Sequence, residues 1–277
     1  MKTKTIINTL VLGFVSLVGV GSAFAYTDTG EITGAETWSG TVELLGDITI
    51  TETGSLTIEP GTVIKCEPKF DMEVGGEETS RLEIIADGGT LNAVGTADNP
   101  VTFTSYADNP EPGDWFGIVV KSDQVTLRHC IIEYGTDGIL IVQNGLPTVE
   151  NCTIQHNSDD GIDIDVPEEF EIKGCHINEN TGNGLRFEEK GSLTLTDCEM
   201  NNNGGGGCYL NYVNNVDVSD CRFNENGGGS CHARDYYYDC GGLQSYGSDI
   251  VSVTNCEFRS NQRSEERRVG KECATGC

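Results

Sequence analysis

The chain has 277 residues, with 17 lysine and arginine residues against 44 aspartate and glutamate residues, a formal net charge of −27 at pH 7. Nucleic acid binding depends on clustered positive charge that neutralises phosphates, so this composition argues against DNA and RNA as partners. The same charge suits divalent cations as ligands and favours solubility in a salty medium.

The first 25 residues have the pattern of a secretory signal peptide. Lys2 and Lys4 give a positive start, residues 6–20 form an apolar run, and the small-x-small sequence AFA precedes Tyr26. The run is short for a membrane span, and no later segment is apolar enough for one. A buried amino-terminal helix is the alternative interpretation. We expect a secreted or cell-surface protein whose mature chain begins at Tyr26 and has no transmembrane segment.

The next part of the chain carries short runs in which every second residue is apolar. Segments 46–66 and 81–105 show this pattern, with Gly, Pro or Asn at the expected corners. A period of two indicates β-strands with one buried face. Between these segments, residues 67–80 are expected to form an excursion loop.

From residue 127 the alternation becomes a repeat of about 23 residues. Each repeat has an apolar residue three positions before a cysteine and another two positions after it, and a Gly then leads into a short strand. In the last five repeats an Asn stands five positions after the cysteine. A turn repeated at the same place stacks strand on strand in parallel, about 4.8 Å apart. The cysteines that set the register are Cys130, Cys152, Cys175, Cys198, Cys221 and Cys256.

These six cysteines are predicted to point into the core. Neighbouring Cα atoms lie within disulfide range, but parallel Cβ vectors disfavour a bond. The sequence leaves both interpretations open, packed free thiols and disulfide bridges. Cys66 and Cys208 are also predicted in the core.

The step from Cys221 to Cys256 is about twelve residues longer than the others, which places an inserted loop at residues 227–241. Cys231 and Cys240 bracket it and predict a disulfide in an exported protein. A sugar cleft needs aromatic rings beside polar groups, and tyrosines also suit a protein-binding surface. A third interpretation is that the loop tyrosines only cover the side of the solenoid and bind nothing. The side chains that the loop would supply for binding are His232, Arg234, Tyr236, Tyr237 and Tyr238.

The sharpest acidic cluster is NSDDGIDID at residues 157–165. Asp163 and Asp165 are two apart, so both are expected to point outward from one strand, with Glu188 one coil above Asp165. Three carboxylates this close repel one another unless a cation or a proton is shared. A calcium site on Asp163, Asp165 and Glu188, a glycosidase carboxylate pair, and solvated turn acids are the open interpretations. Arg186 lies between the acidic rows, so the candidate catalytic residues are Asp163, Asp165, Arg186 and Glu188.

The end of the chain differs in composition from the rest. Residues 263–273, RSEERRVGKEC, resemble the translation of a common sequencing adapter. A native basic tail is the alternative. We set residues 263–277 aside as a non-native tail and expect the natural chain to continue beyond Gln262.

Four stretches resemble the opening coils of large bacterial secreted β-helix proteins: SGTVELLGDITI, GSLTIEPGTVIKC, GTLNAVGTADNPVTFTS and GDWFGIVV. Residues 26–262 as a whole resemble the right-handed parallel β-helix repeat proteins of the pectate-lyase-like type. The resemblance implies one all-β domain, a single-stranded right-handed parallel β-helix of about nine or ten coils. It does not fix an activity, because this scaffold hosts lyases, hydrolases, adhesins and tailspikes.

The resemblance also implies a binding face, the outward side of the Gly-led strand. The first outward row there is Leu140, Asp163, Arg186, Tyr209 and Gln244. The second is Val142, Asp165, Glu188, Asn211 and Tyr246. Residues 157–165 resemble the Asn-Thr-Asp-Gly segment of polygalacturonase-like hydrolases, but the paired Asp, His-Gly and Arg-x-Lys motifs of that family are missing. With the loop, the predicted ligand-binding residues are Tyr209, Asn211, His232, Arg234, Tyr236, Tyr237, Tyr238 and Gln244.

We expect a β-helix protein that binds a polysaccharide or another cell-surface component through this face and the 227–241 loop. It would act as a monomer or as part of a longer chain, with calcium as the one cofactor that the pattern suggests. The competing hypothesis is a polysaccharide lyase or glycoside hydrolase acting on an acidic or neutral polysaccharide. A passive spacer within a larger surface protein is the third.

Overall fold

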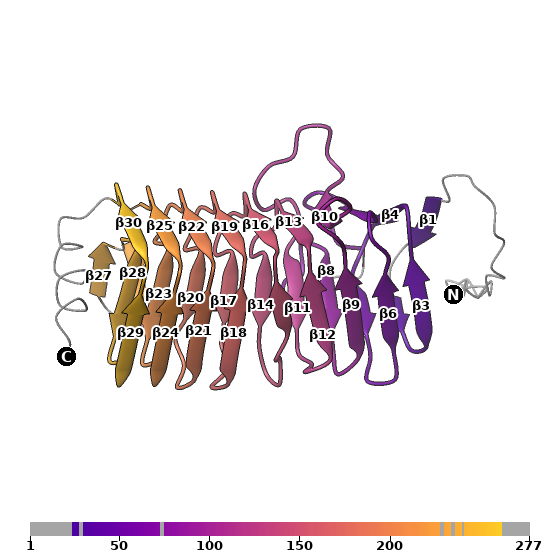
Figure 1. Ribbon diagram of the computed structural model, residues 1–277. Helices are drawn as coiled ribbons and strands as arrows, with labels where there is room; N and C mark the ends of the chain where they lie inside the picture. Colours follow the sequence, from indigo (N-terminus) through magenta and orange to yellow (C-terminus); the bar gives the residue numbers. More distant parts are fainter. Residues whose placement is uncertain are drawn as a thin grey trace, which may run out of the picture.

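The strands of this chain pair with strands one coil earlier and one coil later, and almost every pairing is parallel. The computed structural model describes residues 24–27, 30–72, 75–227, 230–233, 236–239 and 241–261. Within these residues the strands form three long parallel sheets, which we call A, B and C in the order that the chain visits them. Figure 1 shows the coils stacked from the indigo amino-terminal end to the yellow carboxyl-terminal end.

Each coil contributes one strand to each sheet. Sheet A consists of β1 (Phe24–Thr27), β4 (Thr41–Leu44), β7 (Val63–Cys66), β10 (Val101–Ser105), β13 (Cys130–Glu133), β16 (Thr153–Gln155), β19 (His176–Asn178), β22 (Glu199–Asn201), β25 (Arg222–Asn224) and β30 (Glu257–Arg259). Sheet B consists of β2 (Gly30–Ile32), β5 (Ile48–Ile50), β8 (Glu83–Ala86), β11 (Gly117–Val120), β14 (Ile139–Ile141), β17 (Ile162–Ile164), β20 (Leu185–Phe187), β23 (Cys208–Asn211) and β28 (Leu243–Tyr246). Sheet C consists of β3 (Ala35–Trp38), β6 (Ser55–Ile58), β9 (Thr90–Val94), β12 (Val125–Arg128), β15 (Thr148–Glu150), β18 (Glu169–Lys173), β21 (Ser192–Thr196), β24 (Asn215–Ser219) and β29 (Ile250–Thr254).

This arrangement confirms the predicted parallel β-helix. The sheets contain ten, nine and nine strands, which agrees with the expected nine or ten coils. The described residues contain no helix, and therefore no helix that is long and apolar enough to cross a membrane. One antiparallel pair interrupts the pattern, the hairpin of β26 (Ser230–Ala233) and β27 (Tyr236–Asp239).

All three long insertions leave the solenoid at the corner between sheets A and B. Residues 67–82 separate β7 from β8, residues 106–116 separate β10 from β11, and residues 225–242 separate β25 from β28. The first includes the predicted excursion loop, and the third the predicted 227–241 loop. This corner borders both sheets, so the insertions flank the outward faces of sheets A and B.

The core is built of ladders of like residues, because equivalent positions in successive coils lie directly over one another. In sheet C the inward ladder from Leu127 to Val218 is buried, as is the ladder from Ile132 to Phe223 in sheet A. The cysteine ladder is buried except at Cys256, and its thiols are free. The structure therefore favours packed thiols over bridges, and Cys66 and Cys208 are in the core as predicted.

A ladder of buried asparagines locks the corner between sheets A and B. The Asn180 amide donates to the Asn203 side-chain oxygen (3.0 Å) and to the Ile154 carbonyl (3.2 Å), and its own oxygen accepts from the Asn157 main-chain N–H (3.1 Å) and amide (2.8 Å). Each amide before Asn261 thus joins three coils, and the buried polar groups of the ladder have partners. The ladder is Asn157, Asn180, Asn203, Asn226 and Asn261.

Left-handed backbone conformations recur at two positions in each of the later coils. The residue before each ladder cysteine has a positive φ, for example Asn151 at 54° and Asp197 at 55°. The ladder asparagines themselves do not, and the residue before each of them does instead, such as Glu179 at 58°. The asparagine needs its amide in the core, so its neighbour takes the strained conformation.

We predict that Asn180→Ala lowers the free energy of unfolding by about 2–4 kcal/mol. The substitution leaves the buried Asn157 main-chain N–H and side-chain amide without their acceptor. Chemical denaturation followed by circular dichroism measures the change. The control is Asn215→Ala, an exposed residue whose amide reaches only the Ser192 hydroxyl (3.3 Å), and a change of less than about 0.5 kcal/mol is expected there. Equal losses in both variants would contradict the role assigned to the ladder.

Candidate functional site

The excursion loop crosses the outward face of sheet B at β8 and β11. At the start of β8, the buried Glu83 carboxylate accepts the main-chain N–H groups of Glu77 (2.9 Å) and Glu78 (2.5 Å). Beyond the end of β11, the Lys121 ammonium contacts the Glu77 carboxylate (2.7 Å). Ile85 and Val119 point outward by strand alternation but are buried, so this part of the face is closed.

Beyond this loop, the floor of the face is formed by β14, β17 and β20. The pairing aligns Leu140, Asp163, Arg186, Tyr209 and Gln244, which confirms the predicted first outward row. The Arg186 Nε donates to Asp160 Oδ2 (2.8 Å), and its Nη2 donates to the Asp163 carboxylate. Its Nη1 lies 3.9 Å from the Glu188 carboxylate. Arg186 therefore sits between acidic groups, as the sequence indicated.

Two residues that the sequence reasoning missed complete this carboxylate cluster, which we define as Asp137, Asp160 and Asp163 around Arg186. Asp137 Oδ1 accepts the Asp160 N–H (3.1 Å), and Asp160 Oδ1 accepts the Asn183 N–H (2.5 Å) and amide (2.9 Å). The three aspartates are 8%, 3% and 6% exposed. The sequence did contain a signal for Asp137 and Asp160. An Asp or Asn stands directly before the Gly that leads each of three successive strands, at steps of 23 residues.

Burial shifts the cluster toward protonation. It raises the pKa of Asp137 to about 8, and the neighbouring charges of Asp163, Asp160 and Asp159 add to the effect. Burial also raises the pKa of Asp163 to about 7 against the opposing influence of Arg186, and it raises the pKa of Asp160. One guanidinium cannot balance three buried carboxylates, so Asp137 holds a proton at neutral pH.

Two of the three predicted calcium ligands already have a positively charged partner, the Arg186 guanidinium. Asp163 and Glu188 both face Arg186, and Asp165 is exposed. The tightest carboxylate group in the described part of the chain is Asp137, Asp159 and Asp160, with one oxygen of each within 4.8 Å of the others. Both Asp160 oxygens already accept hydrogen bonds, which fits poorly with the many oxygen ligands that calcium takes. Calcium on Asp163, Asp165 and Glu188 stays a prediction.

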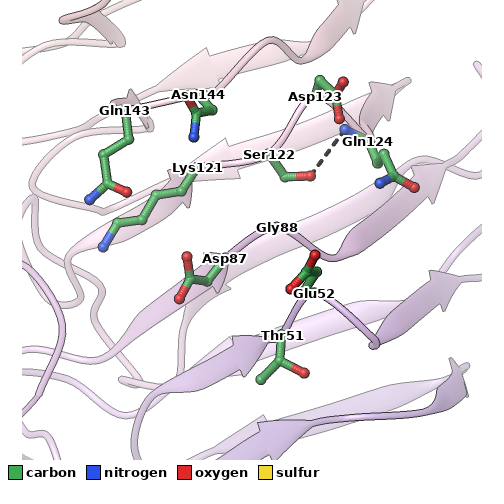
Figure 2. Close-up of a pocket in the computed structure, with 10 residues that line it drawn as sticks. All are labelled: Thr51, Glu52, Asp87, Gly88, Lys121, Ser122, Asp123, Gln124, Gln143 and Asn144. Atoms are coloured by element: carbon green, nitrogen blue, oxygen red, sulfur yellow. Dashed lines mark hydrogen bonds between the residues drawn. The ribbon is translucent and has the colours of Figure 1, made fainter.

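The second outward row lies where sheet B turns into sheet C, in each coil one residue after the last inward residue of the sheet B strand. Main-chain N–H groups of this row donate to the preceding coil, as Asp87 does to Ile50 and Lys121 to Ala86, so the row extends into the early coils. We call it the edge row: Thr51, Asp87, Lys121, Val142, Asp165, Glu188, Asn211 and Tyr246. Its early part is hollowed into a groove of about 550 Å³, the edge groove. Figure 2 shows its lining from four successive coils: Thr51, Glu52, Asp87, Gly88, Lys121, Ser122, Asp123, Gln124, Gln143 and Asn144.

The predicted ligand-binding residues fall into three groups. Tyr209 is fully buried and cannot offer its ring to a ligand in this conformation, which corrects the expectation for that residue. Its ring lies 6.3 Å from that of Tyr246, whose hydroxyl accepts from the Gln244 amide. Gln244 and Asn211 are half-buried and reachable.

The loop residues are described less fully. For His232, Tyr236, Tyr237 and Tyr238 the structure gives the backbone of the hairpin. Arg234 and Cys240 lie outside the described residues. The Cys231–Cys240 disulfide therefore stays a prediction, as do residues 1–25 as a signal peptide and residues 263–277 as a foreign tail.

We predict that the protein loses stability as the pH rises from 5 to 8. The pKa of Asp137 is raised in the folded chain, so its stabilising proton is fully present below the unfolded pKa near 3.8 and is lost as the pH approaches about 8. Asp137→Asn mimics the protonated form and should flatten this slope. Thermal unfolding across the pH range measures it, with exposed Asp217→Asn as the control. An unchanged slope in Asp137→Asn would refute the assignment.

We predict that Arg186→Gln lowers the free energy of unfolding by about 3 kcal/mol at pH 7, because the buried Asp160 and Asp163 carboxylates lose their cationic partner. The loss should shrink at pH 5, where protonation replaces the ion pair. Arg128→Gln is the control, since it breaks an exposed pair with Glu150 (2.8 Å) that contributes less than about 1 kcal/mol. Denaturant titration at the two pH values measures both, and a larger loss at pH 5 would contradict the charge argument.

Two family models match the chain. Residues 30–128 match the pectate-lyase like beta helix domain, and residues 116–265 match the right handed beta helix region. No curated protein and no solved structure matches it significantly. The second match spans more than half of the sequence and agrees with the three parallel sheets. The chain therefore belongs to the right-handed parallel β-helix family.

Proposed function

We propose that this protein is exported and binds a linear polysaccharide along the edge row, with the edge groove as its main site. The observation that carries this proposal is the groove itself, a hollow of about 550 Å³ to which four successive coils contribute polar side chains. Ligand sites are concave and present a few fixed polar groups that orient the ligand. The family supports a carbohydrate-related or surface role in general terms.

The repeat of the solenoid suits a repeating ligand. Successive coils are about 4.8 Å apart, a step comparable with the length of one sugar ring. The groove offers a hydroxyl from Thr51 and amides from Gln124, Gln143 and Asn144. These groups donate and accept hydrogen bonds, as sugar hydroxyls require. A polymer lying along the edge row could repeat the same contacts from coil to coil.

The row continues toward the carboxyl-terminal coils, where it offers Asn211 and Tyr246. Tyr212, directly after β23, is 58% exposed and presents a flat apolar surface that a sugar ring can cover. The predicted aromatic loop 227–241 emerges from the same coil as β28. This end would supply the stacking contacts that the groove lacks.

A second function, hydrolysis of a glycosidic bond, is favoured by one observation. Asp137 keeps its proton near neutral pH while Asp160 next to it faces a guanidinium, and a glycosidase needs a protonated and an ionised carboxyl side by side. Lyase chemistry at Arg186 is disfavoured, because its acidic partners raise the pKa of the guanidinium and hold its proton. The burial of all three aspartates leads us to place binding first.

We predict that the full chain is retarded in native gels that contain its polysaccharide. A panel of neutral, uronate and amino polysaccharides supplies the ligands. Gln124→Ala combined with Gln143→Ala and Asn144→Ala should weaken the retardation at least tenfold, because the amides that orient the sugar are gone. The matched control is Thr126→Ala with Thr148→Ala and Thr194→Ala, three outward positions of sheet C.

Reducing ends are measured in the same mixtures. New ends that disappear in Asp137→Asn would make the protein a hydrolase. No retardation by any polysaccharide, or equal retardation of the amide variant, would overturn the proposed binding site.

A further inference from the structure

The turns between sheets B and C are strongly acidic. They carry eight carboxylates and two lysines, and this excess lies along the edge row. The acidic residues are Glu52, Asp87, Asp123, Asp165, Glu168, Glu188, Glu189 and Asp249. The lysines are Lys121 and Lys190.

The cation inside the edge groove, Lys121, already forms an ion pair within the protein. The Lys121 side chain is 14% exposed and its ammonium contacts the Glu77 carboxylate at 2.7 Å, so it has no charge to offer an anionic ligand. Among the described residues, none forms an ion pair with Glu52, Asp87 or Asp123, although all three carboxylates are exposed. The groove therefore has uncompensated negative charge.

These carboxylates have the spacing of the solenoid. Glu52, Asp87 and Asp123 come from three consecutive coils and line the same groove, together with the amides of Gln143 and Asn144. A uronate polymer would bring one carboxylate per sugar against them, and like charges at such distances repel. A polymer with an amino group on each sugar would instead meet an acidic partner on each coil.

Resting on the proposed polysaccharide site, we propose that the edge groove selects a polysaccharide whose sugars carry free amino groups, and rejects uronate polymers. The hydroxyls of such a chain contact Thr51 and the groove amides, and its ammonium groups pair with Glu52, Asp87 and Asp123. The pairing is exposed, so it is sensitive to salt. The proposal gives the acidity of the early coils a role beyond solubility.

The test compares three hexasaccharides of equal length by isothermal titration calorimetry on the full chain at pH 5.5. The probes are a β-1,4-linked glucosamine hexamer, its fully N-acetylated form, and an oligogalacturonate. We expect the glucosamine hexamer to bind at least tenfold more tightly than the acetylated form, and the oligogalacturonate not to bind. The preference should fall as the salt concentration rises from 0.05 to about 0.5 M.

Two triple variants separate the groove from the general charge of the protein. Glu52→Gln with Asp87→Asn and Asp123→Asn should remove the preference for the amine and leave weak binding of the acetylated hexamer. Glu169→Gln with Glu171→Gln and Asp217→Asn neutralises three exposed positions on sheet C and should leave the preference intact.

The outcomes distinguish the two proposals. Tighter binding of the acetylated or galacturonate hexamer would overturn the amino-sugar inference and keep the polysaccharide site. Equal loss in both triple variants would show diffuse charge attraction and overturn the inference as well. No binding of any hexamer would overturn the inference. The proposed function would fall with it only if no polysaccharide of the gel panel retards the protein.

Discussion

A coil of this protein can bury its apolar side chains only when another coil lies against it, so contact between successive coils is the condition for every other feature. Parallel backbone hydrogen bonds set the distance between coils, and the asparagine ladder from Asn157 to Asn261 fixes their rotation at one corner. Because equivalent positions stack, a single residue type is repeated through the core. The outward rows inherit the same regularity, which is how a polar edge can extend over many coils.

Departures from that regularity are concentrated at one corner. The insertions at residues 67–82, 106–116 and 225–242 all lie between sheets A and B. They cost the solenoid no strand pairing, because the next strand of sheet B resumes its register each time. The first insertion covers β8 and β11, and the carboxylate cluster begins just beyond it, at β14. The insertions and the buried charges thus change the surface of the solenoid and leave its strand pairing unchanged.

The sequence was sufficient for the parts that repeat. Cysteine spacing and the residues around it predicted the strands, the register, the inward ladders and the outward rows, since each was observed several times in one chain. Single events were harder to predict. Tyr209 and Asp163 were correctly placed on the outward face, but nothing in the alternation shows whether something covers an outward residue. The pairing of Arg186 with Asp160 was missed because Asp160 lies in the turn, outside the period-two pattern.

The buried thiols have a consequence for how this chain must be made. Inside the solenoid they are shielded from oxidants. Burial raises the pKa of Cys66, and a hydrogen bond with the neighbouring ladder thiol, together with burial, raises the pKa of Cys152 and Cys175, so little reactive thiolate forms. Before folding, every one of them is open to reaction. If the chain is exported through an oxidising compartment, as the amino-terminal segment predicts, random disulfide formation between its cysteines would compete with assembly of the coils. On that route, survival of the reduced ladder would depend on the coils closing faster than their thiols oxidise.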